Sequence, residues 1–518
     1  MNIVLSNNQA AIKSLEKEFK MQKTRVENHD DFKRCMVAAE PLTKGDIIVE
    51  ELPYAFGPKQ NSDIVCLGCY RSLDFGEDGD SMDRCYICDW PLCSTCSDLQ
   101  VHQGECEIFF QANVTFAGNV SEDGVCTQLD CITPLRILLA KENDPIRWER
   151  EIAQMEYHDR ERRALTEIWN ADRINIAQYL RGPCMLADRF SEDLIMQVVG
   201  ILEVNAFEAR TPEGYTFRCI YPNTAVLAHN CVPNVTRSVY PSEGYKVRLR
   251  TMRDLEEGEQ LFLSYTYTLD GTKERQDNLK NGKFFLCMCD RCKDPTELGT
   301  HFSSIKCHKC IDGLVTNLNP LDNNAEWKCN ICEFQMSQLD MSQYLSTIET
   351  EIESVKQMGS SSQRLELTEE YLEKFENVLH PLHYLLTGMR QNLIEMYGRV
   401  EGYQMIELSN SLLERKIDLC RQLLLVLEKF EPGLSRTSAM VMYELHVPLV
   451  LLAKRAFDAG TITVKSLEER IIEPIALLRQ CVQTLQYEDT FSQEGVLGQI
   501  AQEALQKLST NFNALHNQ

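Results

Sequence analysis

The chain has 518 residues, of which 43% are hydrophobic and 25% charged, and this length predicts two to four domains, since single hydrophobic cores seldom exceed about 300 residues. Its formal net charge of −24 at pH 7 disfavours a protein that binds nucleic acid over its whole surface, because phosphate contacts require clustered Lys and Arg. The same charge leaves Lys-rich protein tails as suitable partners.

The first segment, residues 1–30, is amphipathic and charged, without the apolar core of a signal peptide. No run of about 18 apolar residues occurs in the chain, so we expect no membrane span and a place in the cytoplasm and nucleus. Residues 33–56 and 245–265 alternate apolar and polar positions around turns and predict β structure. Residues 132–203 predict helix. From about residue 338, long amphipathic segments broken at Pro432 and Gly433 predict a helical-repeat array.

Most of the 22 cysteines stand at short fixed spacings, which in a reducing compartment indicates metal sites rather than disulfides. A Cys-x2-Cys pair lets a tight turn present two thiolates to one tetrahedral ion. The first cluster holds three such pairs and one His-x3-Cys pair, enough for two closed zinc sites. The order of the four pairs favours interleaving, the first with the third and the second with the fourth. The ligands of the cluster are Cys66, Cys69, Cys85, Cys88, Cys93, Cys96, His102 and Cys106.

Two further clusters follow the second β region and bring the expected number of zinc sites to about four. One has the spacing of a zinc ribbon: Cys307, Cys310, Cys329 and Cys332. The other supplies three ligands, Cys287, Cys289 and Cys292, and Cys231 is the candidate for the fourth, since tetrahedral zinc takes four. The scattered cysteines are expected as small buried apolar residues: Cys35, Cys126, Cys131, Cys184, Cys219, Cys420 and Cys481.

The segment AHNCVPN at 228–234, followed by GEQLFLSYTY and FFLCMCDRC, resembles the SET-domain protein lysine methyltransferases. The finger at 66–106 resembles a MYND finger, and residues 379–398 and 427–453 resemble the helical C-terminal domain of the SET- and MYND-domain subfamily. The extra zinc ribbon and the short finger spacing are similar to its arthropod branch.

The resemblance implies an α+β multidomain protein: a β-rich SET domain with an inserted zinc-bound MYND finger, post-SET zinc sites and an all-α, TPR-like C-terminal domain. The implied boundaries are 1–30 for the N-terminal segment, 31–61 for the SET N-terminal part, 62–108 for the finger, 109–200 for the helical insert, 201–270 for the SET core, 271–336 for the post-SET region and ribbon, and 337–518 for the C-terminal domain.

The resemblance also implies the site residues of an S-adenosylmethionine-dependent protein-lysine N-methyltransferase. Tyr265 is the residue at the methyl-transfer centre, and Phe207 and Tyr221 line the lysine channel. The residues implied at the cofactor are Arg34, Ala228, His229, Tyr265 and Phe285. A match to the post-SET zinc ligands supports Cys231 as the fourth ligand. Expected partners are a protein substrate with Lys-containing tails and Pro-rich peptides bound by the finger, and the expected state is a monomer.

Two departures from the family pattern leave a second function open. Lys33, Arg34 and Cys35 stand where the family has Gly-x-Gly at the cofactor, and side chains there reshape or close a pocket that glycine leaves open. Ala228 stands where the family has Asn, which removes cofactor hydrogen bonds worth about 1 kcal/mol each. The alternative is therefore a catalytically weak or inactive SET scaffold that recruits partners, as a transcriptional regulator, through its finger and helical domain.

Overall fold

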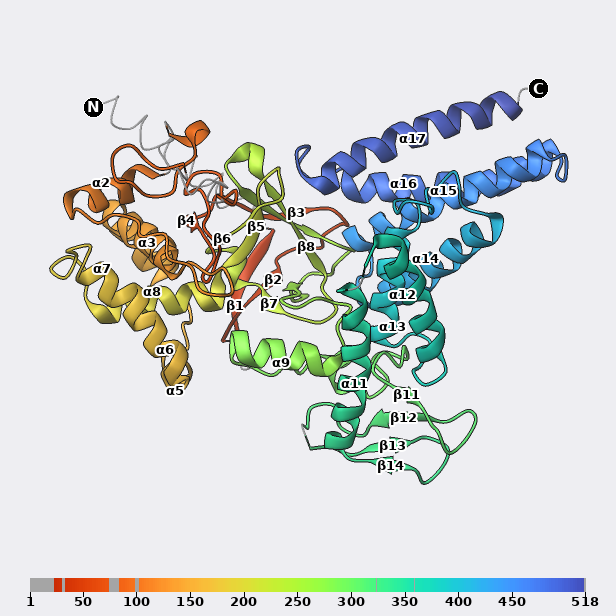
Figure 1. Ribbon diagram of the computed structural model, residues 1–518, viewed down its shortest axis with the longest axis horizontal. Helices are drawn as coiled ribbons and strands as arrows, with labels where there is room; N and C mark the ends of the chain where they lie inside the picture. The colour runs from red at the N-terminus through yellow and green to blue at the C-terminus, as the bar shows by residue number, and fades with distance from the viewer. Residues whose placement is uncertain are drawn as a thin grey trace.

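The structure is a computed structural model of the chain, and it describes residues 23–29, 33–73, 83–97, 102–322, 324–357 and 359–516. Most of the expected N-terminal segment, residues 1–30, lies outside the described residues, as does the side chain of Lys33. The described parts form a strand-rich centre with one helical region on each side (Figure 1). No helix in the described ranges combines the length and apolar character that a membrane crossing requires.

The strand-rich centre consists of small sheets, two of them antiparallel with strand orders β3-β9-β8 and β4-β6-β5, plus a β1-β2 hairpin. β7 and β10 pair in parallel, with Phe262 opposite Ala228 and Leu263 opposite His229. This parallel pair brings the AHNC segment beside the segment that carries Tyr265. The strands are β1 Thr24–His29, β2 Lys33–Ala38, β3 Ile47–Glu51, β4 Ala55–Gly57, β5 Phe207–Arg210, β6 Thr216–Ile220, β7 Ala228–His229, β8 Val235–Tyr240, β9 Lys246–Thr251 and β10 Phe262–Leu263.

The finger and the helical insert share one apolar core, so the finger is not an independent module. Trp90 stacks on Phe109 with ring centroids 3.9 Å apart, and both belong to the cluster that contains Ile132 and Leu135 of the insert. The insert is helical as predicted, with π-helical turns at Trp148–Ile152 and Arg173–Gln178. Its helices and that of the finger are α2 Gln103–Gln111, α3 Ile132–Asn143, α4 Pro145–Arg147, α5 Asp159–Ala164, α6 Thr166–Asp172, α7 Tyr179–Arg181 and α8 Glu192–Asn205.

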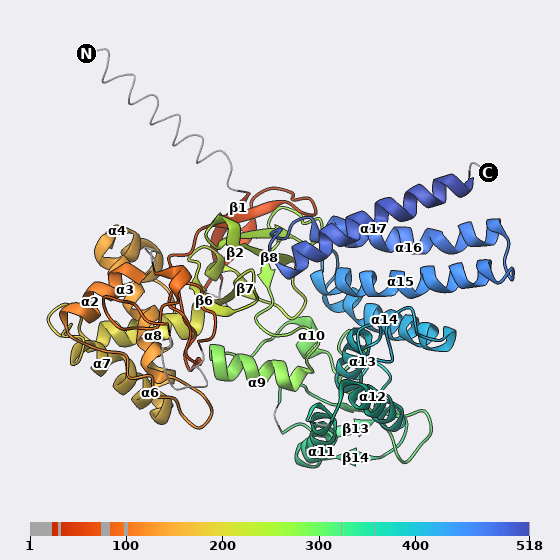
Figure 2. The ribbon, with the colours of Figure 1, turned by 45° about the horizontal axis from the view of Figure 1, so that its top comes forward.

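After the strand-rich centre come two helices, a small four-stranded sheet and a run of long helices. The long helices form the helical C-terminal region that the sequence predicts. In both views α15, α16 and α17 lie side by side (Figures 1 and 2). The elements are α9 Thr272–Lys283, α10 Asp290–Lys293, β11 Ile305–Lys306, β12 Leu314–Asn317, β13 Trp327–Cys329, β14 Gln335–Met336, α11 Gln338–Lys356, α12 Ser361–Glu376, α13 Tyr384–Met396, α14 Asn410–Phe430, α15 Arg436–Asp458, α16 Val464–Leu485 and α17 Gln493–His516.

The predicted break at Pro432 and Gly433 is where the helical region docks on the strand-rich centre. The backbone N–H of Leu434 donates to the carbonyl of Met252 at 2.9 Å. Gly433 has φ +95°, and a Cβ there would lie 2.0 Å from that same carbonyl oxygen. Glycine is therefore required for this close approach. The scattered cysteines are all buried, as expected of small apolar residues: Cys35, Cys126, Cys131, Cys184, Cys219, Cys420 and Cys481.

Two carboxylates, from α9 and α11, meet at the hydroxyl of Tyr384 on α13. That hydroxyl lies 2.8 Å from Glu349 Oε1 and 3.2 Å from Glu274 Oε1. Burial, and then the nearby charge of Glu349, raise the pKa of Glu274 to about 7. A carboxyl group whose pKa is raised on folding contributes stability that is complete below its unfolded pKa and lost as pH rises through the folded pKa.

We therefore expect Glu274→Gln to make the protein less sensitive to alkaline pH. The free energy of unfolding of the parent should fall relative to the variant as pH rises from about 5 to 8, because the ionised Glu274 is the destabilised form. Melting temperatures measured across this pH range check the expectation. Glu333→Gln, whose side chain is 97% exposed, serves as the matched control. Parallel pH profiles of the parent and Glu274→Gln would contradict it.

Candidate metal centres and active site

The structure gathers the sixteen predicted ligands into four groups whose donor atoms all lie within 4.8 Å of one another. In the finger the groups follow the interleaved order that the spacing favours. The groups are Cys66, Cys69, Cys93 and Cys96; Cys85, Cys88, His102 and Cys106; Cys231, Cys287, Cys289 and Cys292; and Cys307, Cys310, Cys329 and Cys332.

The donor distances in these groups fit a tetrahedral zinc ion. Ligands at a Zn–S distance of 2.3 Å stand about 3.8 Å apart along the edge of the tetrahedron. The Sγ–Sγ distances are 3.8 Å for Cys69 and Cys93, 3.7 Å for Cys85 and Cys106, and 3.5 Å for Cys231 and Cys292. In the ribbon, Cys310 and Cys329 are 3.6 Å apart. Each group supplies four ligands, and closed sites of this kind are structural.

A buried carboxylate orients the histidine ligand of the finger. His102 directs Nε2 to Cys88 Sγ at 3.1 Å, and its Nδ1 lies 3.2 Å from Oε1 of Glu105. The same carboxylate oxygen accepts from Arg136 Nη2 at 2.5 Å, and Glu105 is 1% exposed. Arg136, on α3, also donates to Tyr70 Oη and to the carbonyl of Leu67, both at 2.9 Å. This carboxylate fixes the imidazole tautomer and ties the finger to the insert.

Glu105→Gln is expected to weaken the affinity of the finger for zinc by about 10- to 100-fold, since outer-shell carboxylates of histidine ligands have effects of this size. Zinc release to a chromogenic chelator measures it. Glu107→Gln is the matched control, because Glu107 lies on the same helix with its side chain exposed. Equal zinc release by the two variants would show that Glu105 does not support the ligand.

His229 connects the third metal group to Tyr265. The backbone N–H of Tyr265 donates to His229 Nδ1 at 2.9 Å, which places the imidazole proton on Nε2, 3.2 Å from Cys231 Sγ. Because both ring nitrogens are engaged within the protein, a contact of His229 with a cofactor is limited to its main chain and ring carbons. His229 is 4% exposed.

Tyr265 is held by its main chain and by its hydroxyl. The hydroxyl donates to the carbonyl of Leu227, immediately before β7. Burial raises the pKa of Tyr265 to about 12, so the hydroxyl keeps its proton at neutral pH. The donated proton leaves an oxygen lone pair that can accept a hydrogen bond from another group. This tyrosine therefore orients a neighbouring group and cannot act as a general base at neutral pH.

The aromatic side chains predicted at the cofactor gather around Tyr265. The ring centroid of Phe285 lies 6.5 Å from that of Tyr265 and 6.0 Å from that of His229. Arg34 is exposed, and its Nη2 donates to the carbonyl of Gln154 at 3.2 Å.

At the position of the missing Asn, the AHNC loop offers no polar side chain. Ala228 is 9% exposed and carries only a methyl group. Asn230 Oδ1 accepts from the backbone N–H of Val232 at 2.9 Å, so this oxygen is committed to its own turn. Cys35 stands where the family has the second glycine of Gly-x-Gly. Its side chain is 2% exposed, and its thiol lies 3.7 Å from Gln260 Nε2. Cys35 therefore points into the core.

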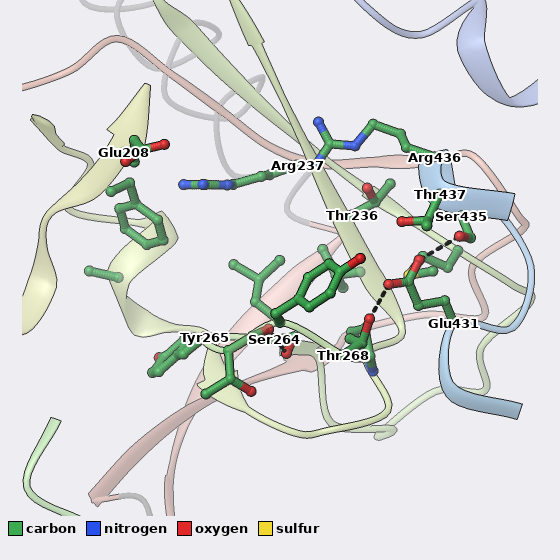
Figure 3. A pocket seen from close by; sticks show the side chains of 18 of the residues that line it. Glu208, Thr236, Arg237, Ser264, Tyr265, Thr268, Glu431, Ser435, Arg436 and Thr437 are labelled. Atoms are coloured by element: carbon green, nitrogen blue, oxygen red, sulfur yellow. Dashed lines mark hydrogen bonds between the residues drawn. The ribbon is translucent and has the colours of Figure 1, made fainter. Parts of the chain in front are cut away.

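A cavity of about 540 Å³ lies beside Tyr265, between the strand-rich centre and the start of α15 (Figure 3). Phe207 lines it, whereas Tyr221 is fully buried behind Phe207, with ring centroids 6.0 Å apart, and donates to the carbonyl of Tyr245 at 2.5 Å. Thr266 also lines the cavity, and its hydroxyl oxygen is buried without a hydrogen-bond partner. An unpartnered buried hydroxyl next to Tyr265 fits a site that receives a polar ligand.

The sequence analysis did not find several residues that support these sites. Arg136, Arg237 and Arg275 are partly or fully buried cations whose neighbours come from distant segments of the chain. A single arginine in an otherwise ordinary helix or strand belongs to no spaced motif, so the sequence does not mark it as part of a site. The alternation of β8 places Arg237 on the same face as the buried Val235.

The comparisons with known proteins agree with this architecture. The sequence profile of the SET domain matches residues 33–266. The SET domain-containing protein SmydA-8, isoform A, of Drosophila melanogaster is 30% identical over 333 residues, which cover 62% of this chain and 68% of that protein. The human N-lysine methyltransferase SMYD2 is 34% identical over 73 residues, 14% of this chain and 16% of that protein. The human histone-lysine N-methyltransferase SMYD1 is 26% identical over 134 residues, 23% of this chain and 27% of that protein.

Proposed function

The chain belongs to the SET- and MYND-domain family of protein lysine methyltransferases, and from this premise we propose that it is an S-adenosylmethionine-dependent protein-lysine N-methyltransferase. The observation that carries the proposal is the position of Tyr265. Its hydroxyl is bound by the carbonyl of Leu227 and its N–H by His229, beside a cavity lined by Phe207. The substrate is a protein, and the methyl acceptor that we propose is a lysine of a histone or of a non-histone protein.

The residues around Tyr265 favour transfer to an amine by positioning and electrostatics. S-adenosylmethionine supplies a methyl group on a sulfonium sulfur. The Phe207 ring restricts the path of a lysine side chain, and the lone pair of the Tyr265 hydroxyl accepts a hydrogen bond from the amine. Because Tyr265 stays protonated, the amine loses its proton to solvent before it reacts. Holding the reactants in line contributes most of such an acceleration.

We assign the cofactor contacts to the main chain of Ala228 and His229, to the Phe285 ring and to Tyr265, with Arg34 at the outer edge. The three aromatic side chains that gather at Tyr265 fit a cationic, adenosine-containing ligand. The missing Asn side chain lowers the expected affinity by about one to two orders of magnitude. The four zinc ions belong to the four cysteine-rich groups and hold the fold rather than react.

The alternative function is a scaffold that binds partners without methyl transfer. Two observations favour it: the side chain of Ala228 cannot form a hydrogen bond, and Asn230 Oδ1 accepts from the backbone N–H of Val232 within its own turn. In both cases we propose that the finger binds Pro-rich peptides and that the protein is a monomer present in the cytoplasm and nucleus. A role in transcriptional regulation is part of the same proposal.

Calorimetric titration of the zinc-loaded protein with S-adenosylmethionine, and separately with its demethylated product, tests the proposal. Micromolar binding, followed by the mass gain of a methyl group on Lys-containing peptides, supports the methyltransferase. Folded protein that binds neither compound and adds no methyl group supports the scaffold instead. Zinc content and the melting temperature are measured on the same sample, so a misfolded preparation is recognised.

A further inference from the structure

In a chain of net charge −24, the cavity beside Tyr265 is lined by three cationic side chains. Arg237 comes from β8, Arg436 from the start of α15 and Lys283 from the end of α9. Lys283 Nζ donates to the carbonyl of Val204 at 2.7 Å, so this cation is used to cap α8. Arg237 and Arg436 remain as the positive groups that face the cavity (Figure 3).

Of the two arginines, Arg237 is the one with a buried guanidinium nitrogen that lacks a hydrogen-bond partner. Its Nη1 is buried and has no hydrogen-bond partner, and its guanidinium lies over the Phe207 ring with Cζ 5.1 Å from the centroid. Burial, and then the positive charge of Arg436, lower the pKa of Arg237. A guanidinium that is partly buried against another cation is stabilised when an anion joins the pair.

Three carboxylates near the pair, Glu208, Glu431 and Glu488, already have partners, and Arg436 is one of those of Glu488. Glu208 lies 2.8 Å from Lys59 Nζ and 3.7 Å from Arg210. Glu431 accepts hydrogen bonds from the hydroxyls of Thr268 and Ser435. Glu488 is 3.7 Å from Arg436 Nη1 and accepts from Ser238 at 2.9 Å, while burial raises the pKa of Glu488 and so weakens it as a counter-charge.

A second cavity, of about 310 Å³, adjoins the first along the same wall. The two cavities share Glu208, Arg237, Arg436 and Thr437. A polypeptide that places a lysine beside Phe207 and continues into the second cavity therefore passes the two arginines. An extended chain advances about 3.3 Å per residue, so the residue that meets them lies within a few positions of the lysine.

We propose that Arg237, together with Arg436, binds an anionic side chain of the substrate polypeptide close to the methyl-accepting lysine. A carboxylate or a phosphate offers two oxygens to the planar guanidinium, and both chemistries match the site. The proposal rests on the proposed function for the identity of the substrate as a Lys-containing polypeptide. It adds a specificity-determining pair, which selects sequences with an acidic residue near the lysine.

The test uses fluorescent peptides with one central lysine, in which each flanking position in turn, up to about four residues away, is Glu, phosphoserine or Gln. Binding to the full-length, zinc-loaded protein is measured by anisotropy, with and without S-adenosylmethionine. We expect about tenfold tighter binding when one flanking position is anionic, because a charge-assisted hydrogen bond has roughly that effect. The Glu and phosphoserine series distinguish the two chemistries.

Arg237→Gln should remove the preference for the anionic peptide while leaving binding of the Gln peptide within about twofold. Arg237→Lys keeps the charge over Phe207 and should retain part of the preference. Arg421→Gln is the matched control, since Arg421 lies on α14 with a 51% exposed side chain and pairs with Glu473. A melting temperature accompanies each variant.

The outcomes separate this proposal from the function on which it rests. Anion-selective binding that is lost in Arg237→Gln supports the arginine pair, even when no peptide gains a methyl group and the methyltransferase itself fails. The proposal is overturned if the parent binds the anionic and Gln peptides equally. It is also overturned if the parent binds neither peptide. An anion preference that persists in Arg237→Gln overturns it as well, whatever the methylation result.

Discussion

Tyr265→Phe is expected to lower the turnover number for lysine methylation by about 100- to 1,000-fold while leaving the fold intact. The substitution removes one oriented hydroxyl at the proposed reaction centre, and the loss of a single such group has effects of this size. Phe keeps the ring against Phe285, and the backbone N–H still donates to His229. Product formation under saturating cofactor and peptide, together with the melting temperature, measures the two effects.

Tyr371→Phe, on α12 and away from the cavity, is the control for loss of a tyrosine hydroxyl. Unchanged methylation in Tyr265→Phe would remove the hydroxyl from the proposed site. The pH profile adds an independent test, since the pKa of Tyr265 is raised to about 12. Between pH 7 and 9 the rate should therefore follow the ionisation of the lysine amine and not that of Tyr265.

Arg275→Met is expected to destabilise the region around the third metal group by about 3–5 kcal/mol. Arg275 is fully buried; its Nε lies 3.2 Å from Cys231 Sγ, and its Nη1 lies 3.2 Å from Glu297 Oε2. Without it, the thiolates lose a hydrogen-bond donor. Glu297, which is also buried, keeps only Arg291 as a cation, at 3.1 Å.

Native-state hydrogen exchange of the α9 amides measures this local free energy directly, and zinc release to a chelator should become faster in the same variant. Lys273→Met is the control, because Lys273 lies on the same helix with a 54% exposed side chain. Exchange rates in Arg275→Met that match those of the control would contradict the structural role of Arg275. The effect should extend to the helical region, since the Arg291 guanidinium lies 3.3 Å from the centroid of the Phe430 ring on α14.

Buried arginines join two of the zinc groups to neighbouring regions of the protein. The finger is fastened to the insert by Arg136, and the third group is fastened to α9 and α14 by Arg275 and Arg291. Loss of zinc at either place therefore loosens a junction between regions and not only a local turn. Metal removal should consequently affect the cavity beside Tyr265, because β7 carries His229 two residues before the ligand Cys231.

Much of the fold and three of the four metal groups could be predicted from local signals, whereas Cys231, 56 residues before Cys287, was assigned to the third group with the help of the family resemblance. A Cys-x2-Cys pair needs only a tight turn, and four pairs in succession indicate their own interleaving. The amphipathic period after residue 338 and the break at Pro432 and Gly433 are likewise properties of neighbouring residues. The parallel pairing of β7 with β10 joins segments more than thirty residues apart, and the sequence analysis did not predict it.

The tertiary structure decided which side chains serve the sites. It turned His229 into a link between Tyr265 and Cys231, placed Tyr221 behind Phe207, and directed Arg34 toward Gln154. It also brought Arg237 and Arg436, nearly 200 residues apart in sequence, to one cavity wall. The sequence by itself determined the closely spaced ligands and the helical periods, which depend on spacing along the chain. Hydrogen-bond partners and cavity walls depend on long-range packing, so they required the folded structure.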